Sequence, residues 1–336
     1  MMDNSLDVTF RRGRLEIRGR DVTMVVLLAI AVVALMIVAV PLTNGVFYTG
    51  NNLTNLMRQM TTTGLLSLGM LFVILTGGID LSVGSIVAFS ALLAAGLSLR
   101  HDLPVPLCFL IGAATGAVWG AISGSLVARF KLAPFVVTLA AMTTIRGLCY
   151  VYSDVPIGPK DPGFKALGAF TFKTFKVSGS TLAFPATTLI MIGFFILGMV
   201  FLNRTSLGRS TIAIGGNRET VRLAGISVAK GIITAYVISG ICAGTAGVLL
   251  ASRLNNVQPT LGTAYELDAI AACVIGGANL AGGRGTIRGT VMGVLVLAIM
   301  NNLLSLRSVD TYWQSVLKGL IIILVILLQA RSRQRG

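Results

Sequence analysis

The sequence predicts an all-α polytopic membrane protein. Of its 336 residues, 54% are hydrophobic and only 12% are charged, whereas a soluble domain carries roughly 25% charged residues. Apolar runs of about 18 to 25 residues recur along the chain, and each is long enough to cross a hydrocarbon core of roughly 30 Å. A transmembrane barrel would instead show short segments that alternate polar and apolar residues, and this chain shows continuous apolar runs.

About ten transmembrane helices are expected from these runs. Residues 1–21 form a basic arm on the cytoplasmic side, residues 22–330 the transmembrane domain and residues 331–336 a cytoplasmic tail. No convincing cleavage site follows the first apolar run, so we expect this span to be retained. The predicted spans are 22–40, 57–76, 83–100, 105–128, 134–152, 182–202, 231–252, 265–281, 285–305 and 312–329.

The basic residues predict the orientation of these spans. If the N-terminus is cytoplasmic, most of the 27 Lys and Arg residues fall in inner segments, as the positive-inside rule requires. Both termini are then cytoplasmic. The net charge of +15 is explained by this orientation and by attraction to anionic lipid. A nucleic-acid partner is not expected, because the basic residues are divided among loops.

Residue types that carry chemistry are few. The four cysteines lie singly in apolar runs, and the one histidine, His101, lies in a predicted loop. This pattern predicts neither a disulfide framework nor a metal or cofactor site. An enzyme would need converging acid, base or nucleophilic groups, which the spans do not offer, so we expect a protein without catalytic activity of its own.

An internal repeat interrupts the apolar pattern. Residues 77–84 read GGIDLSVG and residues 276–283 read GGANLAGG. Glycine pairs let a helix break, and paired breaks in two halves of a chain indicate transporter architecture. Asp80 and Asn279 stand at equivalent positions in the two motifs, where each could accept hydrogen bonds from freed amides or cap the following helix. The breaks could also border a translocation route, and the two interpretations are compatible.

Polar residues within the spans are candidates for lining that route. Each could equally be satisfied within its own helix, as is usual for Thr or Ser in a span. The candidates are Thr61, Thr62, Thr63, Asp80, Ser82 and Asn279.

Glycines at every fourth residue predict close helix packing in two further segments. They are Gly112, Gly116, Gly120 and Gly124 in one segment, and Gly285, Gly289 and Gly293 in the other.

Two cations lie inside predicted spans. Arg146 and Lys318 are each about 9 Å from the outer ends of their spans, where a charge is costly unless it is paired or hydrated. Glu266 and Asp268 begin another span near the same level. We therefore predict a structural layer of ion pairs formed by these four residues, with direct contact to a substrate as the alternative.

Two long loops join the spans. The outer loop, residues 153–181, contains three prolines and four lysines, and it is either a docking surface for an external partner or a variable surface loop. The inner loop, residues 203–230, contains a short polar helix candidate at 217–224, with Asn217 as its N-cap and Gly225 as its stop. A helix across the inner face is a surface that a soluble partner could bind and displace.

Several strings resemble the ribose-type permease subunits of bacterial ATP-binding-cassette importers for simple sugars. These are ILTGGIDLSVGS at 74–85, AIGGN at 213–217, RLAGI at 222–226 and QPTLGTAYELDAIAA at 258–272. The likeness runs from about residue 50 to the C-terminus. One departure is Ala264, where relatives often carry glycine, and it concerns local backbone geometry.

The resemblance implies an inner-membrane subunit with about ten spans and a channel formed by two permease copies or a pair of related permeases. It also implies a separate cytoplasmic ATP-binding subunit as the source of energy and a periplasmic sugar-binding protein that delivers the substrate. The inner loop would then couple to the ATPase. The residues assigned to this coupling are Gly215, Gly216, Asn217, Arg218, Glu219, Arg222 and Gly225.

Two other transport mechanisms remain open at this stage. An ion-coupled secondary transporter would use buried carboxylates such as Asp80, Glu266 and Asp268, but it leaves the polar inner loop unexplained. An ATP-binding-cassette permease for a branched-chain amino acid would share parts of the architecture. The chain contains no phosphate-binding Gly-x-x-x-x-Gly-Lys-(Ser/Thr) loop, so nucleotide energy would have to come from another chain.

Overall fold

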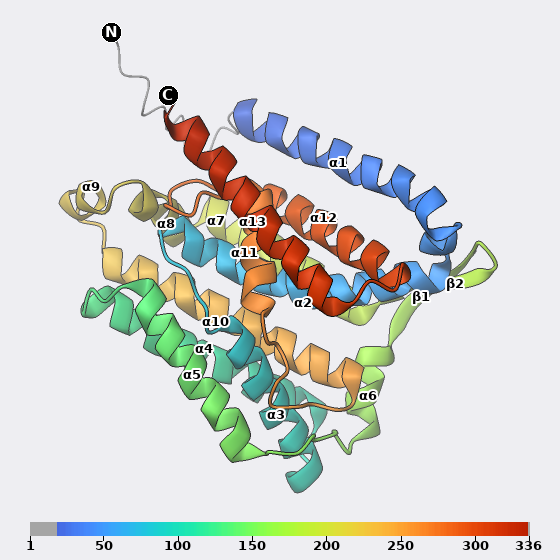
Figure 1. Cartoon of the computed structure of the whole chain (residues 1–336). Coiled ribbons are helices and arrows are strands. Elements are labelled where there is room, and N and C mark those ends of the chain that lie inside the picture. The colour runs from blue at the N-terminus through green and yellow to red at the C-terminus, as the bar shows by residue number, and fades with distance from the viewer. Residues whose placement is uncertain (1–18, 335–336) are drawn as a thin grey trace.

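The computed structural model describes residues 19–334, which are almost entirely helical (Figure 1). The outer loop holds one short helix and an antiparallel hairpin, and the inner loop holds two short helices. In chain order the elements are α1 (Gly19–Thr43), η1 (Val46–Tyr48), α2 (Gly50–Leu75), α3 (Val83–His101), α4 (Val105–Arg129), α5 (Pro134–Tyr152), α6 (Pro162–Ala169), β1 (Thr171–Val177), β2 (Ser180–Pro185), α7 (Ala186–Arg204), α8 (Ser206–Gly216), α9 (Arg218–Leu223), α10 (Val228–Leu254), α11 (Tyr265–Ile275), α12 (Ile287–Leu306) and α13 (Thr311–Gln334).

The predicted fold class is confirmed. Within residues 19–334, eight helices are long and apolar enough to cross a membrane, namely α1, α2, α3, α4, α5, α7, α10 and α12. The other two predicted spans correspond to α11 and α13. Helix α11 has 11 residues and a length of about 16 Å, whereas α13 has 24 residues.

Three predicted boundaries were wrong. Helix α2 begins at Gly50 rather than near residue 57, because the Thr49 hydroxyl accepts a hydrogen bond from the Asn52 amide and caps the helix. Residues 182–185, predicted as the start of a span, instead belong to strand β2. The span predicted at 265–281 stops at Ile275, where the second Gly-Gly motif begins.

Close helix packing builds the core around α2, α4 and α10. A Cβ atom added to Gly116 of α4 would lie 2.0 Å from the carbonyl oxygen of Gly240 in α10, and the reverse distance is also 2.0 Å. In the same way, a Cβ on Gly293 of α12 would lie 2.0 Å from the Ala272 carbonyl oxygen. The glycines of α4 and the pair Gly289 and Gly293 of α12 are therefore packing surfaces, whereas Gly285, predicted in the second ridge, precedes α12 with φ +157°. The core continues around buried side chains such as Phe72 of α2.

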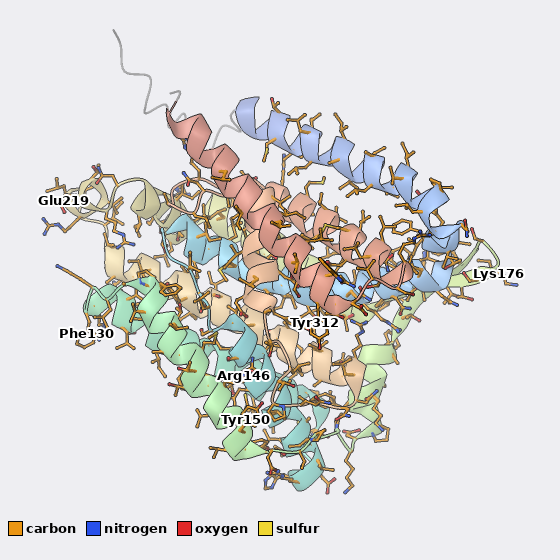
Figure 2. The ribbon with its side chains drawn as sticks, viewed as in Figure 1. Phe130, Arg146, Tyr150, Lys176, Glu219 and Tyr312 are labelled. Carbon is orange, nitrogen blue, oxygen red and sulfur yellow. The ribbon has the colours of Figure 1, made fainter. Side chains whose placement is uncertain are left out.

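The described inner and outer loops lie at opposite ends of the helix bundle. Helix α1 begins and α13 ends on the same side as α8 and α9, while η1, α6 and the β1–β2 hairpin lie at the other end (Figure 1). Phe130 and Glu219 mark the first end and Lys176 the second in Figure 2. The loops assigned to the cytoplasm from their basic residues thus share one face.

Candidate functional site

The first Gly-Gly motif ends helix α2. The helix stops at Leu75, and Gly77 takes a left-handed conformation with φ +77°, which a residue with a side chain adopts only at a cost. The Gly78 amide then donates to the Val73 carbonyl at 3.1 Å. Residues 76–82 continue to α3 without helical structure.

The second motif ends helix α11 in the same way. The helix stops at Ile275, Gly277 has φ +88°, and the Ala278 amide donates to the Cys273 carbonyl at 2.9 Å. Gly277, and not Gly276, is therefore the structural counterpart of Gly77. Aligning the two octets on their sequences pairs the wrong glycines, because the helix end sets the position of the left-handed residue.

At Asp80 and Asn279, the positions that the sequence alignment pairs are also structurally equivalent. The Asp80 carboxylate accepts a hydrogen bond from the Ser82 amide, and the Asn279 side-chain oxygen accepts one from the Ala281 amide, each at 3.0 Å. Each is a turn closed by a side chain two residues before the amide. Asp80 therefore binds a freed amide and does not cap α3, whose N-cap is Ser82.

Asp80 lies in a fully enclosed polar cluster. Its side chain has 0% exposure and also accepts hydrogen bonds from the Ser82 hydroxyl at 2.6 Å and the Ser239 hydroxyl at 2.9 Å. The Tyr236 ring of α10 is also fully buried, and its hydroxyl lies near Gly78. Ser239 was not found from the sequence, because a single serine in a long apolar helix carries no signal of its partner.

Helix α9 is the short polar helix that the sequence predicted. The Asn217 side-chain oxygen accepts hydrogen bonds from the Glu219 and Thr220 amides, both at 3.0 Å, and Gly225 follows the helix with φ +74°. Glu219 and Arg222 form an exposed ion pair at 2.6 Å. An exposed pair of this spacing stabilises a helix by only about 0.3–0.5 kcal/mol, so the stability of α9 does not account for these two charges.

Helix α8 joins both Gly-Gly motifs. A Cβ atom on Gly215 would lie 1.9 Å from the Leu75 carbonyl oxygen and 2.3 Å from the Gly283 nitrogen. The Gly283 amide in turn donates to the Leu75 carbonyl at 3.0 Å. The Arg218 guanidinium of α9 donates to the Thr76 carbonyl at 3.1 Å. The inner loop is therefore in direct backbone contact with both motifs.

 Thr76 and Arg218 are 142 positions apart in the chain, so no local sequence pattern pointed to the contact between the inner loop and the first motif.

The predicted layer of intramembrane charges has a different form from the one expected. Lys318 of α13 lies 2.8 Å from the Asp268 carboxylate of α11, and both side chains are largely buried. Arg146 of α5 instead donates to the backbone carbonyls of Pro259 and, at 2.8 Å, Leu261. The structure thus corrects the prediction that Arg146 pairs with a carboxylate. The segment between α10 and α11 passes close to α5 and offers free carbonyl groups instead.

Glu266, the fourth member of that predicted layer, lies against the start of α3. A Cβ added to Gly84 would lie 2.6 Å from its carboxylate oxygen. Glu266 and Asp268 both belong to α11, and of the four residues Lys318 and Asp268 are the two that form an ion pair.

The candidate path residues do not surround one cavity. Thr61 is 2% exposed, donates to the Met57 carbonyl at 3.1 Å and lies 3.3 Å from the Thr188 hydroxyl. Thr62 is also buried, and Thr63 is half-buried one residue farther along α2. These threonines therefore lie in the packing of α2, apart from the cluster of Asp80 and Ser82 and from the partly exposed Asn279.

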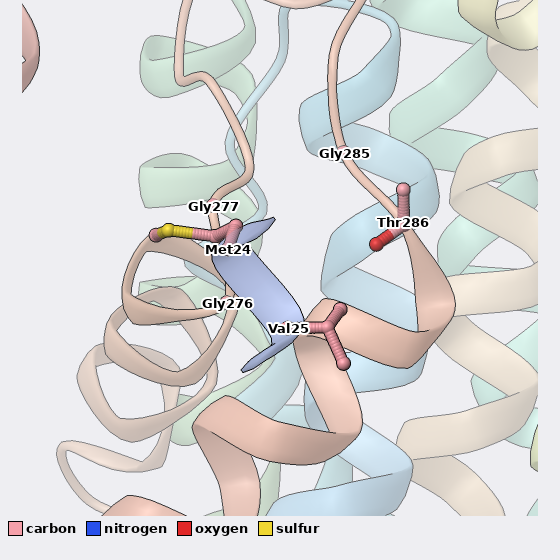
Figure 3. A pocket seen from close by; sticks show the side chains of 6 residues that line it. All are labelled: Met24, Val25, Gly276, Gly277, Gly285 and Thr286. Atoms are coloured by element: carbon pink, nitrogen blue, oxygen red, sulfur yellow. The ribbon is translucent and has the colours of Figure 1, made fainter. Parts of the chain in front are cut away.

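A small pocket lies between α1 and the second motif (Figure 3). Its volume of about 20 Å³ suits a water molecule, whereas pockets for small-molecule ligands measure about 300 to 1,000 Å³. Helix α1 thus covers the second motif without leaving room for a sugar. The lining residues are Met24, Val25, Gly276, Gly277, Gly285 and Thr286.

Comparison with known proteins identifies the family. The family described as "branched-chain amino acid transport system / permease component" matches residues 52–326. The chain belongs to this permease family. The permease is 42% identical over 300 residues to the ribose import permease protein RbsC of Bacillus subtilis, a match that covers 89% of this chain and 90% of the relative.

Two further relatives extend the likeness over nearly the whole permease. The ribose import permease protein RbsC of Haemophilus influenzae is 37% identical over 333 residues, with 97% of each chain covered. The xylose transport system permease protein XylH of Escherichia coli is 33% identical over 359 residues, with 91% of each chain covered. No solved structure matches the permease.

Proposed function

We propose that this permease is the membrane subunit of an ATP-binding-cassette importer that carries a monosaccharide or related polyol across the bacterial inner membrane. The observation that carries the proposal is the inner face: α9 presents an exposed, charged surface, and α8 joins that surface to both Gly-Gly motifs. The relatives named for ribose and xylose support a sugar as the substrate. The permease of such an importer alternates between outward and inward access.

A cytoplasmic ATP-binding subunit is the proposed partner of α9. The residues assigned to coupling divide into two groups by their contacts. Asn217 caps the helix and Arg218 binds Thr76, so both shape the surface from within. Glu219 and Arg222 bind each other and remain exposed, which leaves them as the proposed contacts with the ATPase. The start of α1 and the end of α13 lie on the side of α9, so both termini are proposed to be cytoplasmic.

The opposite face is the proposed docking surface for a periplasmic sugar-binding protein. The outer loop folds into α6 and the β1–β2 hairpin, which gives it a fixed shape. Phe172 and Phe175 of β1 are 60% and 50% exposed, and Lys173 and Lys176 beside them are exposed too. Exposed aromatic residues are typical of a protein-binding surface.

A second copy of the permease, or a related permease, completes the proposed channel. The pocket beside α1 is far too small for a sugar. The open groove of about 440 Å³ on α4 is lined by Val118, Ala121, Ile122, Ser125 and Leu126, and a polyol needs more hydrogen-bonding groups than this surface offers. We therefore place the path between two permease chains.

Affinity capture from gently solubilised native membranes tests this proposal. The wild-type permease is expected to bring down a nucleotide-binding protein, and a differently tagged second copy if the channel is a homodimer. Glu219→Lys should reduce capture of the ATPase by about tenfold or more, because charge mismatch at a docking surface costs several kcal/mol. Recovery of the permease alone in repeated wild-type captures would contradict the importer.

A charge swap within α9 separates docking from helix stability. In the double variant Glu219→Arg with Arg222→Glu, the pair can re-form on the same helix, while the charges presented to a partner are exchanged. Continued loss of the ATPase in this variant places the contact on α9, whereas full capture would show that only the helix mattered. Uptake that follows ATP rather than a pH gradient distinguishes the importer from an ion-coupled carrier.

A further inference from the structure

Three segments that are far apart in the sequence meet through their backbones at the inner face. They are residues 75–77 at the end of α2, residues 215–216 at the end of α8, and residues 282–283 in the loop before α12. We call this contact the glycine junction. A Cβ on Gly282 would lie 2.8 Å from the Gly77 nitrogen and 2.9 Å from the Gly215 Cα. Each segment therefore touches the other two through backbone atoms.

Polar links hold the glycine junction together. The Gly283 amide donates to the Leu75 carbonyl at 3.0 Å, and the Arg218 guanidinium donates to the Thr76 carbonyl at 3.1 Å. The turn around Asn279 presents the Ala281 carbonyl toward Gly77, where an added Cβ would lie 3.2 Å from that oxygen. Because these are backbone contacts, displacing one segment by more than a fraction of an ångström must move or separate the others.

We propose that Gly215 and Arg218 are positioning residues that transmit movement of α9 to both halves of the permease at once. This inference rests on the proposed function for the origin of the movement, since the ATPase would push on α9. The junction itself is a property of this chain alone. A single contact at α8 would then move the ends of α2 and of the loop before α12 together, so that both repeats change conformation in one step.

Helix α8 is suited to carry this movement. It runs for 11 residues up to Gly216, and its Ile214 side chain is fully buried in a cluster with Val73 of α2 and Val221 of α9. Apolar packing below the junction and backbone contact within it thus make α8, α9 and the end of α2 one packed unit. Gly216 supplies a matched control, because its backbone belongs to the junction but a Cβ added to it would point away and meet nothing within 4 Å.

The first test measures the geometry in the full-length permease, without any partner. Spin labels are placed at Leu223→Cys, on α9, and at Arg284→Cys, in the loop before α12, and the distance between them is measured by electron spin resonance. Leu223 is 78% exposed and Arg284 is exposed, whereas the native cysteines are buried and react poorly with polar labels. Gly215→Ala should shift this distance by about 1.5 Å or broaden it, because ordinary contacts need about 3.5 Å.

Gly216→Ala should leave the distance as it is in the wild type. If Gly215→Ala also leaves it unchanged, the junction does not position the loop and the inference is wrong. If Gly215→Ala does not fold, Arg218→Gln replaces it, since this change removes the bond to Thr76 without adding volume at the junction. A broader distance distribution in Arg218→Gln, restored in Arg218→Lys, supports the inference, and an unchanged one overturns it.

The second test uses the complex captured with its ATPase. On addition of ATP and Mg²⁺, the mobility of the label at Arg284→Cys should change in the wild type and in Gly216→Ala. In Gly215→Ala this response should fall by about tenfold while the ATPase is still captured and still hydrolyses ATP. A full response in Gly215→Ala would overturn the inference. Failure of the wild type to capture an ATPase would contradict the proposed function instead, and the first test would still decide the role of the junction.

Discussion

The first Gly-Gly motif encloses a carboxylate completely, whereas the second leaves an amide partly exposed. Asp80 has 0% exposure and three hydrogen bonds, two from Ser82 and one from Ser239. The Asn279 side chain accepts one, from the Ala281 amide, in a loop that runs on to α12 at residue 287. Related sequences thus build the same turn in two different surroundings.

The difference shows what each position requires of its side chain. Two carboxylate oxygens can accept from all three donors around Asp80, whereas an amide would turn its NH₂ group toward one of the hydroxyls. Asn279 needs one acceptor only, so an amide suffices. The two halves also differ in the partners of their intramembrane cations: Arg146 binds backbone carbonyls, and Lys318 binds a carboxylate.

The largest difference between the two motifs should come from truncating the two turn residues. Asp80→Ala leaves three donors unpaired in a buried site and should destabilise the permease by about 3 kcal/mol or more, at about 1 kcal/mol or more for each unpaired group. Asn279→Ala should cost about 1 kcal/mol, because the Ala281 amide is near solvent. Thermal unfolding in detergent, followed by size-exclusion chromatography, measures both. Equal losses of stability in the two variants would contradict the stated difference between the motifs.

Charge reversal at the two intramembrane cations should change stability by an intermediate amount. Lys318→Asp places two carboxylates together and should cost about 3 kcal/mol, and adding Asp268→Lys should restore at least half of the lost stability. The matched pair of Arg146→Glu with Glu266→Arg should show no rescue, because Arg146 is bound by carbonyls. The yield of folded protein from membranes reports both cycles. Rescue of the Arg146 pair would show that the predicted ion pair does form there.

The smallest effect should distinguish the two left-handed glycines. Gly77→Ala and Gly277→Ala each place a side chain at positive φ, which costs about 1–2 kcal/mol. At Gly77 the added Cβ also lies 3.2 Å from the backbone carbonyl of Ala281, whereas at Gly277 it meets the flexible Met24 side chain at 3.3 Å. Gly77→Ala should therefore lower the unfolding temperature more. Adding Met24→Ala should improve Gly277→Ala and leave Gly77→Ala unchanged, and any other order would contradict this account.

Local sequence signals predicted a large part of the permease. Long apolar runs predicted the membrane helices, glycines every fourth residue predicted a close-packing face on α4, and Asn217 and Gly225 predicted the ends of α9. These features depend on neighbours within one or two helical turns. The Gly-Gly octets predicted a repeat for the same reason, although the helix ends shift the equivalent glycines by one position.

Only the tertiary structure decided which distant groups meet. Ser239 reaches Asp80 from α10, Arg146 finds carbonyls between α10 and α11, and Gly215 lies against Leu75 and Gly283. By itself, the sequence determined that this is a helical membrane protein with two related glycine motifs and a polar inner helix. It did not determine these contacts, because a hydroxyl, a carbonyl or a bare glycine carries no mark of its partner until helix packing brings the two together.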